Sequence, residues 1–67
     1  MPHLSKQSYA FSFMSDALMA ALAFERSTTE FYRYETRYIY DTKLGDVVEV
    51  RVLEQDGVFV GYVAGEA

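Results

Sequence analysis

Few residues of this chain could do catalytic or metal chemistry. It has a single histidine, His3, and no cysteine. A catalytic triad needs a histidine held against a nucleophile, but His3 lies in a terminal segment that we expect to be frayed. Zinc sites need several cysteine or histidine ligands. The four glycines are isolated from one another, so no glycine-rich phosphate loop is present. We therefore predict that the chain is not an enzyme and has no metal site and no cofactor.

Carboxylates are the one abundant reactive group, with ten aspartates and glutamates. A pair of carboxylates can act as general acid and base, and Asp41 with Asp46 is the candidate pair. Both flank a predicted turn, where aspartate is favoured because it hydrogen-bonds to nearby backbone. We interpret them as turn residues.

A ladder of tyrosines and charged residues runs through Phe31–Tyr40. Tyrosines occupy alternate positions (32, 34, 38 and 40), and Arg33, Glu35 and Arg37 occupy the other set. Strict alternation is the period of a β-strand. Aromatic residues beside arginines are typical of surfaces that bind single-stranded nucleic acid. Here, however, the arginines fall on the opposite face from the tyrosines, and the chain has only six basic residues.

The elements that position these residues fit one domain over residues 1–67, with residues 1–7 as a flexible lead. Tyr9, Phe11 and Phe13 alternate with small residues, which predicts a short strand over Ser8–Phe13. The alternative is that this segment forms the first turns of a long helix.

A helix is predicted over Ala17–Arg26, with Ser15 as N-cap and Asp16 at the positive end of its dipole. Its residues are strong helix formers, and they are apolar on almost every side. One sheet covers one side only. The other side is therefore either covered by a second subunit or partner, or is a tolerated alanine-rich surface.

Three strands follow the helix. They are Glu30–Asp41, Asp46–Glu54 and Val58–Ala64, with Asp56-Gly57 as a two-residue turn before the last. Charge predicts the register between the first two of these strands. Only one register places Arg37 opposite Glu49 and Glu35 opposite Arg51. The tyrosines then lie with the valines on the core face. In the last pair, Leu53 is expected opposite Val60. The predicted class is α+β, a three- to four-stranded antiparallel sheet packed on one face by a single helix, in the order β-α-β-β-β.

The net charge of −4 comes entirely from residues 41–67, because the first forty residues sum to zero. An acidic surface repels phosphate and attracts basic partners. The sheet face away from the helix would combine charged residues with apolar flanks, as protein interfaces do. The predicted partner-binding residues on this face and its rim are Arg37, Asp41, Asp46, Glu49, Glu54, Asp56, Val60 and Tyr62. An ordinary solvated face is the alternative.

These observations favour a non-enzymatic, acidic protein-interaction module that masks a basic surface of a nucleic-acid-binding protein. In size, acidity and absence of motif the chain resembles the small inhibitors encoded by phages and mobile elements, anti-CRISPR proteins among them; no residue motif carries this resemblance. Since no targeting segment is indicated, we expect a cytoplasmic location, which would be the host cytoplasm if a phage encodes the chain. The alternatives are a small homodimeric accessory protein, associating through Ala17–Arg26 or a sheet edge, and a single-stranded nucleic-acid-binding module. No apolar run reaches the ~18 residues of a membrane span, so no membrane partner is predicted.

Overall fold

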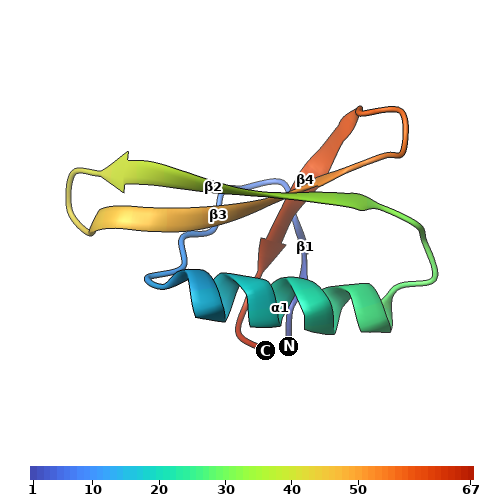
Figure 1. The fold of residues 1–67 in the computed structure, drawn as a ribbon, viewed down its shortest axis with the longest axis horizontal. Coiled ribbons are helices and arrows are strands. Elements are labelled where there is room, and N and C mark those ends of the chain that lie inside the picture. The colour runs from blue at the N-terminus through green and yellow to red at the C-terminus, as the bar shows by residue number, and fades with distance from the viewer.

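A single helix lies across one face of a four-stranded antiparallel sheet in the computed structural model, which describes residues 1–67 (Figure 1). The elements are β1 (His3–Ser5), α1 (Met14–Ser27), β2 (Arg33–Asp41), β3 (Gly45–Leu53) and β4 (Phe59–Ala64). The order of strands across the sheet is β1-β4-β3-β2. The predicted α+β class and the order β-α-β-β-β are confirmed.

The register of β2 against β3 is the one predicted from charge. Glu35 lies opposite Arg51, Arg37 opposite Glu49, and Tyr40 opposite Asp46. Arg51 Nη1 donates to Glu35 Oε1 at 2.9 Å, which is the ion pair that the register implies. The Asp41 carboxylate closes the connecting turn, because its Oδ1 accepts the backbone N–H groups of the second and third residues after it at 2.8 and 2.9 Å.

The hairpin between β3 and β4 is only partly as predicted. Its turn runs over Glu54–Gly57, where the Gly57 N–H donates to the Glu54 carbonyl at 2.9 Å, and Gly57 has a φ of +94°. This is a three-residue loop with a glycine bulge rather than the predicted two-residue turn. A second irregularity then shifts the register, so that Leu53 lies opposite Phe59 instead of Val60. The pairs farther from the turn, Val52 with Gly61 and Arg51 with Tyr62, are as predicted.

The first strand is not where the sequence placed it. Residues 3–5, which we expected to belong to a flexible lead, form β1 and pair with β4. In the predicted strand Ser8–Phe13, only Phe11 is paired, through two backbone hydrogen bonds of 2.8 Å with Val48. The bridge lies beside the half of β3 that has no regular pairing with β4, so one residue satisfies an otherwise open edge.

The helix begins earlier than predicted. Its N-cap is Phe13 rather than Ser15, and no side chain caps its free N–H groups. Ala17, Ala20 and Phe24 lie on its buried side. Two of these three residues are alanines, whose small side chains let the helix approach the sheet closely.

The core lies between α1 and the sheet. It consists of Phe11, Ala17, Ala20, Phe24, Val48, Val50, Val52 and Val63, with partly buried side chains such as Leu4 packed around it. Glycine is needed at position 61, where β1 ends beside β4, because a Cβ there would lie 2.6 Å from the Ser5 carbonyl oxygen. The alternate valines of β3 supply three of these eight residues, as their period-2 pattern indicated.

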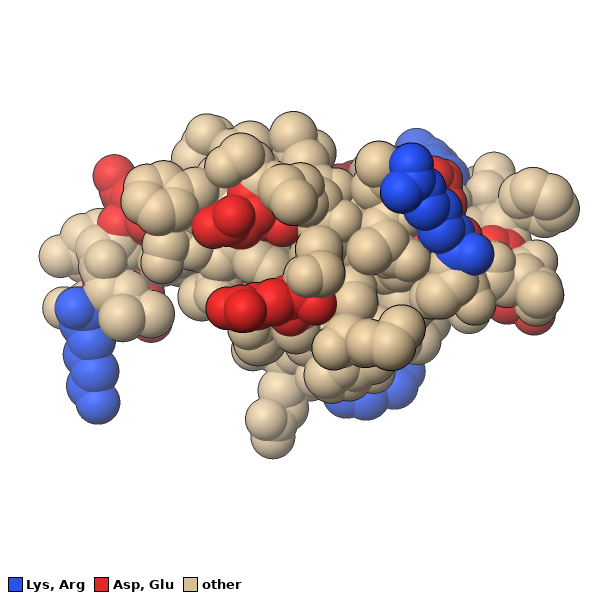
Figure 2. Space-filling model, turned by 90° about the horizontal axis from the view of Figure 1, so that it is seen from below, with Lys and Arg blue, Asp and Glu red and all other residues tan.

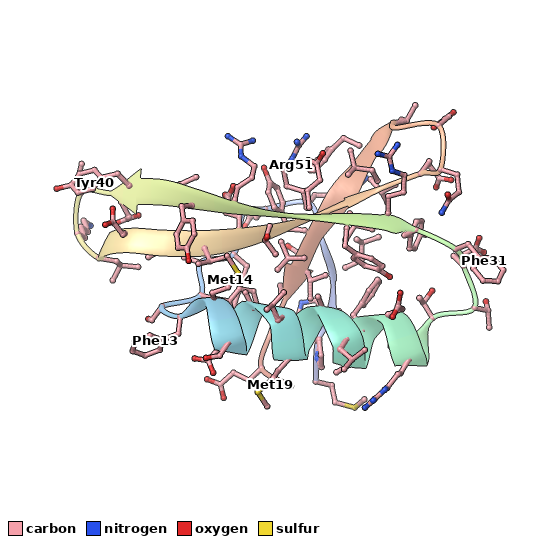
Figure 3. The ribbon with its side chains drawn as sticks, in the orientation of Figure 1. Phe13, Met14, Met19, Phe31, Tyr40 and Arg51 are labelled. Carbon is pink, nitrogen blue, oxygen red and sulfur yellow. The ribbon has the colours of Figure 1, made fainter.

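The tyrosine ladder is buried at one end only, so the prediction that it lines the core is half wrong. Tyr32 and Tyr34 pack against Phe24, with ring centroids 6.4 and 6.3 Å away. Tyr38 and Tyr40 are 70% and 73% exposed. The helix packs mainly on β3 and β4, and the hairpin tip with Tyr40 extends past its start (Figure 3). No helix in the structure has the length and apolar character needed to cross a bilayer.

Candidate functional site

The predicted partner-binding residues do not form one patch. Asp41 lies in the turn before β3 and Asp56 in the turn after it, at opposite ends of a nine-residue strand. Such a strand is about 30 Å long. Both carboxylates are also occupied locally, since Asp56 Oδ1 accepts the Val58 N–H at 3.1 Å, much as Asp41 closes its own turn. The acidic rim is therefore two separate turns, each with an exposed neighbour, Asp46 at one end and Glu54 at the other.

The centre of the predicted surface is covered. Glu49 is only 6% exposed, and its carboxylate accepts a hydrogen bond from the Ser8 hydroxyl. The segment between β1 and α1 therefore passes over Glu49. Arg37 lies opposite Glu49 in register but forms no ion pair with it, since the only ion pair of the structure is Arg51 with Glu35. Arg37 is left exposed and unpaired.

The bulge in the second hairpin exchanges the places of two β4 side chains. Val60, predicted on the face away from the helix, packs against the core. Phe59, predicted in the core, stacks its ring edge-on to Tyr62 at 5.1 Å and lies 5.0 Å from the Arg51 guanidinium. Arg51 points away from the helix (Figure 3). Of the predicted site, Tyr62 remains on this face, in a small cluster with Arg51 and Phe59.

One hollow is found on the molecule, and the sequence did not indicate it. It has a volume of about 330 Å³ and lies between the segment before α1, the first turns of α1 and the C-terminal residues. We call it the acidic cleft; it is lined by Tyr9, Ala10, Phe11, Ser12, Asp16, Met19, Glu66 and Ala67. These residues come from segments at opposite ends of the chain, and the β1–β4 pairing brings them together.

The cleft combines an aromatic wall with carboxylates. The Tyr9 and Phe11 rings pack edge to face with centroids 4.9 Å apart, and Phe11 is held by its hydrogen bonds to β3. Asp16 and Glu66 supply two carboxylates, and no basic residue lines the cleft. Seen from the α1 side, two acidic side chains lie next to each other and the basic ones lie nearer the margins (Figure 2).

An apolar strip on α1 adjoins the cleft. Met19 belongs to the cleft lining, and Leu18 and Leu22 on the same helix are also about half exposed. Met14 points to the sheet, whereas Phe13 and Met19 point away from it (Figure 3). One sheet cannot cover this helix on every side, and the side that carries Leu18, Met19 and Leu22 is left uncovered.

A site of this kind suits a cation attached to an apolar stem. Carboxylates without a basic neighbour attract ammonium or guanidinium groups, and aromatic faces add a cation–π attraction. Lysine and arginine side chains have this combination of apolar stem and charged head. Sequence patterns could not reveal the cleft, because Tyr9, Asp16 and Glu66 become neighbours only through the pairing of β1 with β4.

No protein-family model, no curated protein and no solved structure matches this chain.

Proposed function

We propose that the chain is a non-enzymatic protein-interaction module that binds a basic segment of a partner protein. The observation that supports this is the acidic cleft. It is the only hollow of the molecule, its wall carries Asp16 and Glu66 beside Tyr9 and Phe11, and no basic residue lines it.

The cleft would act as the anchoring pocket of a larger interface. A lysine or arginine entering it would place its charge near the carboxylates and its stem against the rings, an aromatic–cation contact worth about 0.5–1 kcal/mol at a partly exposed site. The apolar strip on α1, with Leu18, Met19 and Leu22, would contact apolar residues beside that anchor. A buried anchor within an apolar area and a polar rim is the usual composition of protein interfaces.

The chemistry of the cleft also favours one class of partner. Proteins that bind nucleic acids carry lysine and arginine in the surfaces that contact phosphate. A module that occupies such residues would mask them from nucleic acid. This is the inhibitory role predicted from the chain's acidity, as for small phage or mobile-element inhibitors acting in a host cytoplasm.

Neutralising the cleft tests the proposal. The double variant Asp16→Asn, Glu66→Gln keeps the shape of both side chains and removes both charges. We expect it to lose about tenfold in affinity for a fluorescent arginine-rich peptide, because exposed charge contacts are each worth up to ~1 kcal/mol and the variant removes two. The measurement is fluorescence anisotropy at low and physiological salt, and binding by the unaltered chain should weaken as salt rises.

The matched control is Asp46→Asn, Glu54→Gln, which makes the same change in net charge at exposed carboxylates on the two turns. Equal loss in both double variants would show that net charge alone drives binding and would reject the cleft. The same variants used as bait in pull-downs from the source cell would show whether a captured partner depends on the cleft. Binding of labelled single-stranded DNA or RNA at low salt, with no binding of the peptide, would favour the nucleic-acid alternative instead.

A further inference from the structure

The outer edge of β2 is long and open. β2 is the last strand of the sheet, and it pairs with β3 alone over nine consecutive residues without a bulge. One set of its backbone N–H and C=O groups therefore points away from the sheet. Such an edge is a template for a further strand.

Several of the devices that usually protect an edge strand are absent from β2, although it carries charged side chains. It contains no proline, no glycine and no lysine, and its ladder with β3 is regular. The opposite edge, β1, is only three residues long. A short strand is itself a protection, so the two edges of this sheet differ in kind.

The helix leaves room beside β2. α1 packs against β3 and β4, so the helix side of β2 is covered only near Phe24. Tyr38 and Tyr40 are exposed there, and Thr36 between the two tyrosine pairs is exposed as well. Aromatic rings exposed on the helix side of a sheet indicate that another surface packs against them.

We infer that two copies of this chain pair through their β2 edges, antiparallel, with Thr36 facing its own copy on the two-fold axis. In this register Glu35 lies opposite the second copy's Arg37, and the symmetry makes that pair twice. Tyr34 lies opposite Tyr38 twice, and Tyr32 opposite Tyr40 twice, which are aromatic pairs of the kind that stabilise neighbouring strands. The two sheets become one, and Arg37 gains the partner that it lacks within the single chain.

Neighbouring registers are disfavoured by the same residues. Moving the axis to residue 35 places Glu35 opposite itself and Arg33 opposite Arg37. Moving it to residue 37 places Arg37 opposite itself. An axis between two residues is excluded by geometry. The two-fold axis that relates antiparallel edges stands perpendicular to the sheet and keeps both helices on the same side, so only residues of the same face can lie opposite one another. An axis at Tyr34 would place Arg33 opposite Glu35, but it pairs only Tyr34 with itself and leaves Arg37 with no carboxylate opposite it. The axis at Thr36 gives Arg37 an acidic partner and pairs all four tyrosines.

The test uses the fact that a residue on the axis meets itself. Thr36→Arg and Thr36→Glu each place two like charges opposite one another, and we expect each variant to raise the dimer dissociation constant about fivefold relative to the unaltered chain. An equimolar mixture of the two variants places Arg opposite Glu and should restore a dimer. Sedimentation velocity over a range of concentrations measures all three.

Thr42→Arg is the control, because Thr42 is also an exposed threonine but lies in the turn beyond β2, so its dimer should match that of the unaltered chain. Circular dichroism spectra confirm that each variant is folded. In the unaltered chain, alternate amides of β2 should become protected from hydrogen exchange as concentration rises. A monomeric unaltered chain at millimolar concentration, or a dimer that neither Thr36 variant weakens, would overturn the inference. This outcome is independent of peptide binding in the acidic cleft.

Discussion

Tyr34 is the residue with the least favourable surroundings in the structure. Its ring packs edge-on against Phe24, but its hydroxyl is buried and has no hydrogen-bond partner. Burial raises the pKa of Tyr34 above 10.0, and the nearby acidic groups Glu25 and Tyr32 add to this shift. A buried donor without a partner costs about 1–3 kcal/mol relative to its hydrated state.

Replacing Tyr34 by phenylalanine should therefore stabilise the fold, or at least leave it unchanged. The ring contact with Phe24 is retained and the unpaired hydroxyl is removed, so we expect the free energy of unfolding to rise by up to about 1 kcal/mol. Urea unfolding followed by circular dichroism measures it. Tyr40→Phe is the control, since Tyr40 is exposed and its hydroxyl is free to meet water.

The same substitution should change the response to alkaline pH. The folded-state pKa of Tyr34 is raised, so the unfolded chain releases this proton first. Ionisation of Tyr34 therefore favours unfolding. Below about pH 10 this group costs the fold no stability through ionisation, and stability is lost as pH rises from there through the folded-state pKa. The unaltered chain should lose stability over that range more steeply than Tyr34→Phe. Equal slopes would mean that the hydroxyl is solvated in solution.

At the scale of the elements, the start of α1 is poorly capped. Phe13 has the extended backbone of an N-cap, with φ −131° and ψ 144°, but no side-chain oxygen to accept the free N–H groups. Its ring is exposed and points away from the sheet (Figure 3). The residue therefore gives the helix neither a cap nor a core contact.

Phe13→Ser should stabilise the helix start. A serine at the N-cap accepts an N–H from the first turn and is worth about 0.5–1 kcal/mol relative to a residue that cannot cap. We expect a higher urea midpoint with unchanged slope. Phe13→Ala removes the same ring without adding a cap, so stabilisation by alanine as well would show that the gain comes from losing the exposed ring.

Pairings between two adjacent strands were predictable from the sequence. Contacts that arise where β4 separates from β3 were not. The pairing of Glu35 with Arg51 follows from charge alternation along two adjacent strands. The position of the first strand does not, because Phe11 bridges to Val48 only where β4 leaves β3. The exchange of Phe59 and Val60 has a similar cause, since the glycine bulge moves these side chains to the other face and a second irregularity restores the predicted register from Gly61 onward.

The candidate site follows the same division. Asp41 and Asp56 were identified as turn residues by type and spacing, and they are. The acidic cleft was missed, because its wall joins Tyr9 to Glu66 across almost the whole chain. Glu49 was expected on an open face, and no pattern showed that the segment around Ser8 would cover it.

At the scale of the whole molecule, the N-terminal segment is part of the structure. Leu4 packs against the core, His3–Ser5 pair with β4, and the Lys6 ammonium donates to the Val60 carbonyl at 2.7 Å. A chain of this length buries only a modest share of its surface, so each such contact is a large part of its stability.

Deleting Pro2–Gln7 should therefore unfold much of the population at 37 °C. The loss of the partly buried Leu4 side chain alone is worth up to about 2 kcal/mol, against a total of several kcal/mol for a small domain. Thermal unfolding by circular dichroism measures the change. Leu4→Ala should give an intermediate loss and Gln7→Ala almost none; a deletion variant as stable as the unaltered chain would show that this segment is a dispensable lead.

The pairing of β1 with β4 also sets the order in which this domain can be completed during synthesis. β1 is made before the other elements, and its only partner strand, β4, is made after them. Until then Leu4 has no β4 beside it, and α1 has only part of its sheet. Contacts between distant segments form slowly. The domain therefore stays incomplete until Phe59–Ala64 is free of the exit tunnel, and the β2–β3 hairpin, whose contacts are local, is the part that can form before β4 emerges.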